Sequence, residues 1–147
     1  MLRLATKEDR REVLRMARAF HRASPYSGIT FSEDVCSALF DQYLAGDRTG
    51  LIIILSVSPT PVGMVIGHCA TPPFSTEKVA SEIAWWVDED HRGSRDSVLL
   101  LKAYEDWALR VGASICQVAM LDDVTDLQRF YQRQGYRPAE RSFVKEI

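Results

Sequence analysis

WWVDEDHRGSRDSVLLLKAYEDWA, residues 85–108, is the stretch on which the fold prediction depends. An apolar run ends at Val87, and a polar turn follows before hydrophobic residues return at helical spacing. The long helix predicted there has one apolar face, formed by Leu100, Tyr104, Trp107 and Val111. A strand that leads through a short turn into a long helix indicates an α/β fold.

The turn at residues 91–96 carries groups that bind anions. The first four N–H groups of a helix have no internal partner, and the positive end of the helix dipole lies there. Arg92 and Arg95 add charged donors that can contact phosphate, and Gly93 lets a ligand approach the backbone closely. The pattern is compatible with a phosphate site, although a solvated turn bearing surface arginines is the commoner case.

The rest of the chain predicts a mixed sheet covered by helices on both faces. Strands are expected at residues 2–4, 51–57, 62–70, 79–88 and 114–121, with final strand segments at 136–137 and 142–146. The turn at residues 58–61 should join two of these strands as a hairpin. The predicted order is β-α-α-β-β-β-α-β-α-β, within one domain that spans residues 1–147.

Two helices are expected between the first and second strands. Thr6 with Asp9 forms a capping box for the first helix, and Ser32 can cap the second. The apolar positions of these helices follow helical spacing: Val13, Met16, Ala17 and Phe20 in the first, and Val35, Leu39 and Tyr43 in the second.

Composition excludes several classes of protein. The chain has 147 residues, 46% of them hydrophobic and 26% charged, and its formal charge of −2 argues against a nucleic-acid partner. No apolar run exceeds five residues, so neither a membrane span of roughly 20 residues nor a signal peptide is expected. Three widely spaced cysteines, Cys36, Cys69 and Cys116, indicate a reducing cytoplasm and no metal site.

The turn resembles the signature of the GNAT family of N-acetyltransferases, Arg/Gln-x-x-Gly-x-Gly/Ala. Arg92, Gly93 and the small residue Ser97 match, whereas Arg95 stands where a second glycine is usual. The Arg95 side chain either crowds a pyrophosphate or clamps one of its phosphates. The sequence Arg-Gly-Ser-Arg also resembles phage-encoded members.

Three further segments are similar to the same family. Residues 2–9 resemble its first strand and helix, residues 61–67 its central hairpin, and residues 130–138 its closing Tyr-x-x-x-Gly-Phe segment, with Tyr136 in place of the phenylalanine. The resemblance implies a single three-layer α/β/α domain (α+β) with a mixed, mostly antiparallel sheet of six to seven strands.

The resemblance also implies an activity: transfer of an acetyl group from acetyl-CoA to a primary amine of a small molecule or protein, in a ternary complex without a metal. A homodimer is also expected, because members of the family commonly form one. The residues expected to bind acetyl-CoA are Trp86, Val87, Asp88, Arg92, Gly93, Ser94, Arg95, Asp96 and Ser97.

Two residues are candidates for proton transfer. Tyr131 matches the family's tyrosine on the last helix and could protonate the leaving thiolate, although it could equally belong to a core stripe. Glu82 lies within an apolar strand, where burial should raise its pKa toward that of a base active near neutrality; a salt-bridged edge glutamate is the alternative. Strand alternation places Glu82 on one face with Ala84 and Trp86.

Substrate contacts are expected at three positions. Tyr26 and Phe31 lie in the loop where the family's variable substrate segment falls, and could line an acceptor pocket. His68 could be a base or a substrate contact, although a hydrogen-bonded sheet histidine is the commoner case.

Two other functions stay open from the sequence. A GNAT-like module could bind acyl-CoA, or serve as an interaction protein, without turnover; the replacement of the usual glycine by Arg95 motivates this alternative. The second alternative is an unrelated mixed-sheet domain that binds no nucleotide.

Overall fold

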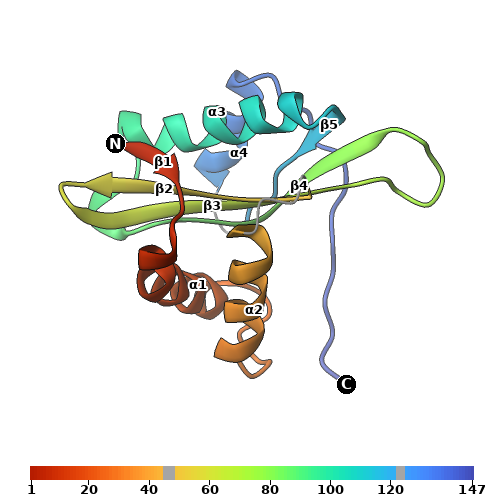
Figure 1. Ribbon diagram of the computed structural model, residues 1–147. Coiled ribbons are helices and arrows are strands. Elements are labelled where there is room, and N and C mark those ends of the chain that lie inside the picture. The colour runs from red at the N-terminus through yellow and green to blue at the C-terminus, as the bar shows by residue number, and fades with distance from the viewer. Residues whose placement is uncertain (45–48, 122–124) are drawn as a thin grey trace.

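Five strands in the order β1-β2-β3-β4-β5 form the middle layer of the computed structural model, which describes residues 1–44, 49–121 and 125–147 (Figure 1). The elements are β1 (Leu2–Leu4), a 3-10 turn η1 (Lys7–Asp9), α1 (Arg10–Ala23), α2 (Glu33–Leu44), β2 (Gly50–Val57), β3 (Thr60–Ala70), β4 (Lys78–Val87), a 3-10 turn η2 (Glu89–His91), α3 (Arg95–Arg110), β5 (Ala113–Gln117) and α4 (Thr125–Arg133).

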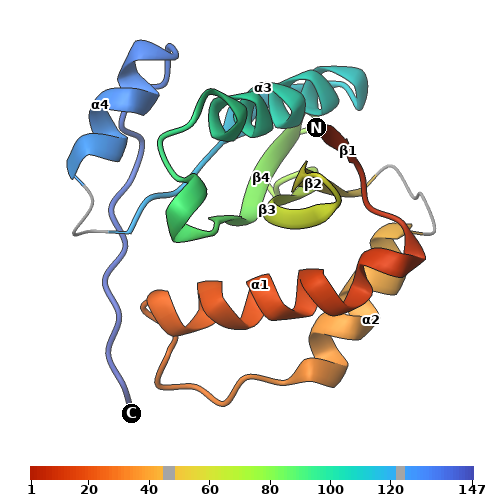
Figure 2. The ribbon, with the colours of Figure 1, turned by 90° about the vertical axis from the view of Figure 1, so that its left-hand side faces the viewer.

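The sheet is mixed and mostly antiparallel. Strands β1 to β4 are antiparallel neighbours, and only β5 runs parallel to β4. Helices α1 and α2 cover one face, whereas α3 lies on the other with α4 beside it (Figures 1 and 2). The three-layer architecture and the β2–β3 hairpin are therefore confirmed.

Strand β2 is buried on both faces because a helical layer covers each side of it. Its residues Leu51, Ile53 and Leu55 pack toward α3, and the intervening Ile52 and Ile54 pack toward α1 and α2. A strand with a hydrophobic core on each face needs apolar side chains at every position, and the unbroken apolar run of β2 meets this requirement.

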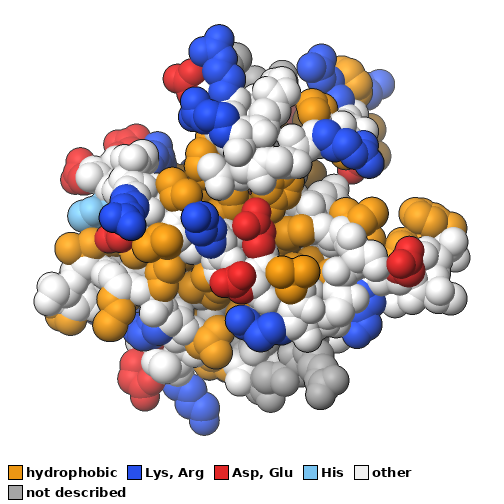
Figure 3. Space-filling model, turned by 90° about the horizontal axis from the view of Figure 1, so that it is seen from above, with side chains coloured by type: hydrophobic (Ala, Val, Ile, Leu, Met, Phe, Trp, Pro, Cys, Tyr) orange, Lys and Arg blue, Asp and Glu red, His pale blue; other side chains and the backbone are white. Residues whose placement is uncertain are grey.

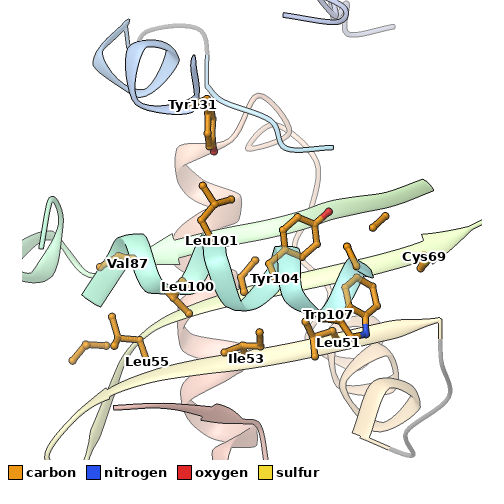
Figure 4. Packing of buried hydrophobic residues seen from close by; sticks show 14 residues of the cluster. Leu51, Ile53, Leu55, Cys69, Val87, Leu100, Leu101, Tyr104, Trp107 and Tyr131 are labelled. Carbon is orange, nitrogen blue, oxygen red and sulfur yellow. The ribbon is translucent and has the colours of Figure 1, made fainter. Parts of the chain in front are cut away.

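The core under α3 is built around two aromatic residues of that helix. Tyr104 and Trp107 lie side by side over the sheet, with ring centroids 5.9 Å apart (Figure 4). Gly67 of β3 permits this approach, since a Cβ at that position would lie 2.8 Å from the Tyr104 ring. The spacing that predicted one apolar face for α3 is confirmed.

The predicted capping box at Thr6 and Asp9 lies on η1, the 3-10 turn that leads directly into α1, and Ser32 caps α2 as predicted. The Asp9 carboxylate accepts a hydrogen bond from the Thr6 N–H at 2.7 Å, and the Ser32 hydroxyl accepts one from the Val35 N–H at 3.4 Å. The expected core position of Val35 is wrong, since that side chain is 68% exposed; Tyr43 is buried as predicted, and Phe40 is buried as well.

The predicted sheet of six to seven strands is wrong in its count. Within the described residues the sheet has five strands, and the two segments expected to end it, 136–137 and 142–146, form no strand. The chain after α4 runs extended and exposed past the β5 side of the sheet to the level of α1 and α2 (Figures 1 and 2). A strand needs a partner edge to satisfy its backbone groups, and this segment pairs with none in the described chain.

None of the helices in the described ranges is long and apolar enough to cross a membrane.

Candidate active site

A β-bulge in β4 turns Glu82 toward the α3 face. Ile66 lies opposite Ala84, but the next residue, Gly67, lies opposite Glu82, so Ile83 is an extra residue in β4. Ala84 and Trp86 pack against α1 and α2. The prediction that Glu82 shares a face with Ala84 and Trp86 is therefore wrong. One inserted residue reverses the side of the sheet to which the preceding side chains point.

The pairing of β4 with β5 ends immediately before this bulge. Within residues 49–121, the two strands pair only between Lys78–Ser81 and Ala113–Gln117. From Glu82 onward β4 has a strand neighbour on one side only, β3. The separation exposes a length of strand edge whose backbone groups can bind an extended ligand.

Glu82 and Tyr131 are brought together by one residue, Ala119. The Ala119 N–H donates to Glu82 Oε2 at 3.0 Å, and the Tyr131 hydroxyl donates to the Ala119 carbonyl oxygen at 3.1 Å. Sequence analysis missed Ala119, because it acts through its backbone and an alanine side chain gives no chemical signal.

The environment of Glu82 favours its neutral form. Burial raises the pKa of this carboxyl group, while hydrogen bonds from the Ala119 and Trp85 N–H groups oppose the shift without cancelling it. A carboxylate with a raised pKa is a better proton acceptor than a free one, so this chemistry suits a general base.

Tyr131 both packs in the core and presents its hydroxyl group at the site. It is 7% exposed, and its ring lies 6.0 Å from Trp85 and 5.6 Å from Tyr136, measured between centroids. Its side chain projects from α4 toward Leu101, with the hydroxyl at the inner end (Figure 4). Burial, and then the nearby Glu82 charge, raise the pKa of Tyr131 above its usual value, so the phenol stays protonated.

The turn before α3 is open to ligands. Ser94 caps the helix, its hydroxyl accepting a hydrogen bond from the Ser97 N–H at 3.2 Å. Gly93 has a φ of +69°, which favours glycine, and a Cβ there would meet no atom within 4 Å. Asp96 is also exposed in this first helical turn, where its charge would oppose a phosphate.

The two arginines of the turn differ in their surroundings. Arg92 Nε donates to the Val87 carbonyl oxygen at 2.9 Å, and its guanidinium lies 4.8 Å from the Trp86 ring centroid. Arg95 is exposed and forms no ion pair or hydrogen bond within the described chain. Arg92 therefore holds the turn against β4, while Arg95 is free to meet a ligand.

The side chains of Trp86 and Asp88 bind each other and α1. Trp86 Nε1 donates to Asp88 Oδ1 at 2.9 Å, and Arg15 donates to both Asp88 oxygens at 3.0 and 2.8 Å. Burial acts to raise the pKa of Asp88, but the hydrogen bonds from Arg15 and Trp86 hold it below its usual value. These side chains thus tie the end of β4 to α1, and Val87 between them is buried.

The structure places His68 away from this site. His68 Nδ1 lies 3.0 Å from the Tyr43 hydroxyl, and the two rings stack on the α2 side of the sheet. This arrangement favours the hydrogen-bonded sheet histidine over a base.

Tyr26 and Phe31, by contrast, line a cavity of about 450 Å³ between α1, α2 and the sheet. The cavity extends to Ile83 and Ala84 at the bulge. Among the described residues, no group of three or more His, Cys, Asp and Glu is placed to hold a metal ion.

The face that carries α3 and α4 bears charges of both signs, interspersed with exposed hydrophobic side chains (Figure 3). No single sign of charge dominates this view, so binding of an anionic ligand there depends on local groups such as the turn amides and Arg95.

Comparison with known proteins agrees with this geometry. Residues 13–136 match the model of the acetyltransferase (GNAT) family. The fold is similar to that of an aminoglycoside 6′-N-acetyltransferase from Acinetobacter haemolyticus, with 16% identity, a TM-score of 0.74, and coverage of 100% of this chain and 99% of that chain. No curated protein matches the chain in sequence.

Two further solved structures share the fold. One is a ribosomal-protein-alanine N-acetyltransferase from Brucella melitensis biovar Abortus 2308, at 18% identity and a TM-score of 0.71, with 100% of this chain and 99% of that chain covered. The other is AAC(6′)-Iy in complex with the bisubstrate analogue CoA-S-monomethyl-acetylneamine, at 15% identity, a TM-score of 0.74 and 100% and 97% coverage.

The family match spans most of the sequence and excludes an unrelated mixed-sheet domain. The chain therefore belongs to the GNAT acetyltransferase family and is an acyltransferase.

Proposed function

We propose that the protein transfers an acetyl group from acetyl-CoA to a primary amine by direct attack within a ternary complex. The observation that carries the proposal is the meeting of Glu82 and Tyr131 at Ala119, where β4 and β5 separate. An acid and a base are thus present where β4 loses its pairing with β5 within the described chain.

The proposed position of acetyl-CoA follows from the turn and the open strand edge. The pyrophosphate lies on the N–H groups of residues 93–96, with Arg95 as its charged partner; the Ser97 N–H is already bonded to Ser94. The pantetheine arm follows β4 from Val87 toward Glu82. Two edge groups already have partners there, since Glu82 accepts from the Trp85 N–H and Arg92 donates to the Val87 carbonyl.

The chemistry exchanges one bond for another at the acetyl carbon. The amine nitrogen attacks the thioester carbonyl, a C–N bond forms, and the C–S bond breaks to release CoA thiolate. The excess proton of the amine passes to Glu82, directly or through one water molecule. The thiolate takes the phenolic proton of Tyr131, which solvent then replaces. The raised pKa makes Tyr131 a weaker acid than a free phenol but keeps it protonated until the thiolate forms.

Conservative substitutions test these two roles. Glu82→Gln and Tyr131→Phe should each lower kcat/KM by roughly 10²-fold, the lower end of the range for general acid–base groups, with little change in acetyl-CoA affinity. Released thiol measured over a panel of amines gives the rate, and calorimetry gives the affinity. Tyr136→Phe is the matched control, because Tyr136 lies in the same aromatic cluster.

Full activity in both variants would remove the assigned roles. Tight acetyl-CoA binding by the unaltered protein without turnover of any amine would instead favour the acyl-CoA-binding or interaction module.

The free arginine of the turn provides a second test. Arg95→Ala should weaken acetyl-CoA binding about tenfold at low salt and less at high salt, because an exposed charge on a phosphate is screened. Arg92→Ala should weaken binding with less salt dependence, since Arg92 supports the turn through Val87. Equal affinity of the Arg95→Ala variant and the unaltered protein in low-salt calorimetry would show that Arg95 does not clamp a phosphate.

We also propose that residues 1–147 form one domain that acts as a homodimer in the cytoplasm. The exposed C-terminal segment and the outer edge of β5 support the dimer, because both leave strand-forming backbone without a partner within the described chain. The three cysteines are all unpaired, which supports a reducing compartment.

A further inference from the structure

The cavity between α1, α2 and the sheet has an apolar lining. Its volume is about 450 Å³, within the range of small-molecule sites. Most of the lining is aliphatic or aromatic, and His21 with a few hydroxyl groups supplies its polar atoms. None of the described residues that line it is an Asp, Glu, Lys or Arg.

Exposed hydrophobic side chains gather around this cavity. Tyr26, Ile29 and Val35 are 56%, 67% and 68% exposed, and all three line it. They come from the loop after α1 and from the start of α2, so the chain brings them together from different elements. Grouped apolar side chains left open to solvent are typical of a binding surface.

The cavity meets the candidate active site at the bulge of β4. Ile83, the extra residue of the bulge, and Ala84 form part of its lining, and Glu82 is the residue before them. A molecule held in the cavity can therefore extend one end toward the point where β4 and β5 separate.

Charge around the cavity disfavours a polycation. The Arg18 guanidinium lies 4.5 Å from the centroid of Phe31, a lining residue, and pairs with Glu33 at 2.8 Å. In the adjoining groove on α1 arginines outnumber carboxylates, because Glu8 and Glu33 face Arg10, Arg11, Arg15, Arg18 and Arg22. A second or third ammonium group placed in the cavity would be desolvated without a carboxylate partner, which costs free energy.

We infer that the acceptor is a monoamine with one compact aromatic or aliphatic body, which the cavity holds while the amine reaches the β4 bulge. This inference rests on the proposed function and names its substrate class. It separates this chain from enzymes that act on aminoglycosides, whose several ammonium groups need acidic partners.

The test compares two amines as acceptors of the acetyl group. The value of kcat/KM for 2-phenylethylamine should exceed that for kanamycin by at least roughly 100-fold, since burying unpaired charges gives discrimination of this order or more. Ile29→Asp should reduce that preference at least about tenfold by placing a carboxylate in the lining. Leu109→Asp is the control, because Leu109 is equally exposed but lies on α3, across the sheet.

A binding measurement separates the two proposals. A rise in melting temperature with 2-phenylethylamine alone, lost in Ile29→Asp and kept in Leu109→Asp, supports the inference without any acetyl transfer. Preferred acetylation of kanamycin, or of a peptide, overturns the inference and leaves the proposed function standing. Absence of both a 2-phenylethylamine shift and any preference for it overturns the inference, and absence of transfer to every amine overturns the proposed function.

Discussion

Burial and hydrogen bonding shift the pKa of the Glu82 carboxyl group in opposite directions. Burial raises the pKa, and two backbone N–H groups lower it by a smaller amount. Because the folded-state pKa lies above the unfolded one, ionised Glu82 destabilises the fold. This destabilisation is absent below the unfolded value of 4.5 and develops as the pH rises through the folded pKa.

Glu82→Gln should therefore raise the melting temperature relative to the unaltered protein more at pH 8 than at pH 4. The expected difference is a few degrees, since 1 kcal/mol shifts the melting temperature of a domain of this size by about 2–8 °C. Scanning calorimetry at the two pH values measures it. Glu89→Gln, at an exposed position, should show no such pH dependence, and an equal response of both variants would contradict the assignment.

Both candidate proton-transfer residues could be identified from the sequence, but the positions of their side chains relative to each other could not. Tyr131 follows from the resemblance, and Glu82 from a carboxylate inside an apolar strand. The face of Glu82 depends on the bulge at Ile83, which arises from pairing with β3 and has no local signal in the sequence. The link through Ala119 is a tertiary contact between segments 37 residues apart.

At the scale of secondary-structure elements, hydrogen bonds to the Asp9 side chain link β1 to the start of α1. Its carboxylate accepts two hydrogen bonds from Arg3, at 2.5 and 2.7 Å, and one from the Thr6 N–H at 2.7 Å. The Arg3 hydrogen bonds, acting against burial, lower the pKa of Asp9 from 3.8 to about 2. Ionised Asp9 therefore stabilises the fold above pH 3.8, and this contribution is lost as the pH falls through about 2.

Asp9→Asn should lower the free energy of unfolding by about 2 kcal/mol at pH 7, the equivalent of a shift of nearly two pKa units. The loss should become small near pH 2, where about half of the Asp9 carboxyl groups of the unaltered protein are protonated, and approach zero at lower pH. Urea unfolding at several pH values measures the difference. Asp126→Asn, at a highly exposed position, is the control; a loss at pH 2 as large as that at pH 7 would refute the pKa assignment.

Local signals predicted most elements well, and long-range pairing explains the failures. The β2–β3 hairpin, the α1 cap and the apolar face of α3 all depend on residues close in sequence. The prediction of final strand segments at 136–137 and 142–146 rested on local sequence, and the described chain offers these segments no strand partner. Val35 follows helical spacing, but the cavity beside α2 leaves it exposed.

At the scale of the whole molecule, the outer edge of β5 and the C-terminal segment have no strand partner within the described residues. Strand β5 ends the sheet order, and its Ile115 side chain is 57% exposed. The C-terminal segment carries Phe143, Val144 and Ile147, all exposed, along an extended path that passes the β5 side of the sheet (Figure 2). Exposed strand edges and apolar extended segments readily pair with another chain.

A dimer in which the C-terminal segment of one copy pairs along β5 of the other would satisfy both features. Light scattering at micromolar concentration should then give twice the monomer mass of 16.6 kDa. Phe143→Asp should shift the mass toward the monomer, because it buries a charge in the new interface. Phe74→Asp is the matched control, since Phe74 is equally exposed but lies between β3 and β4. A mass of 16.6 kDa for the unaltered protein, or a dimer unaffected by Phe143→Asp, would exclude this arrangement.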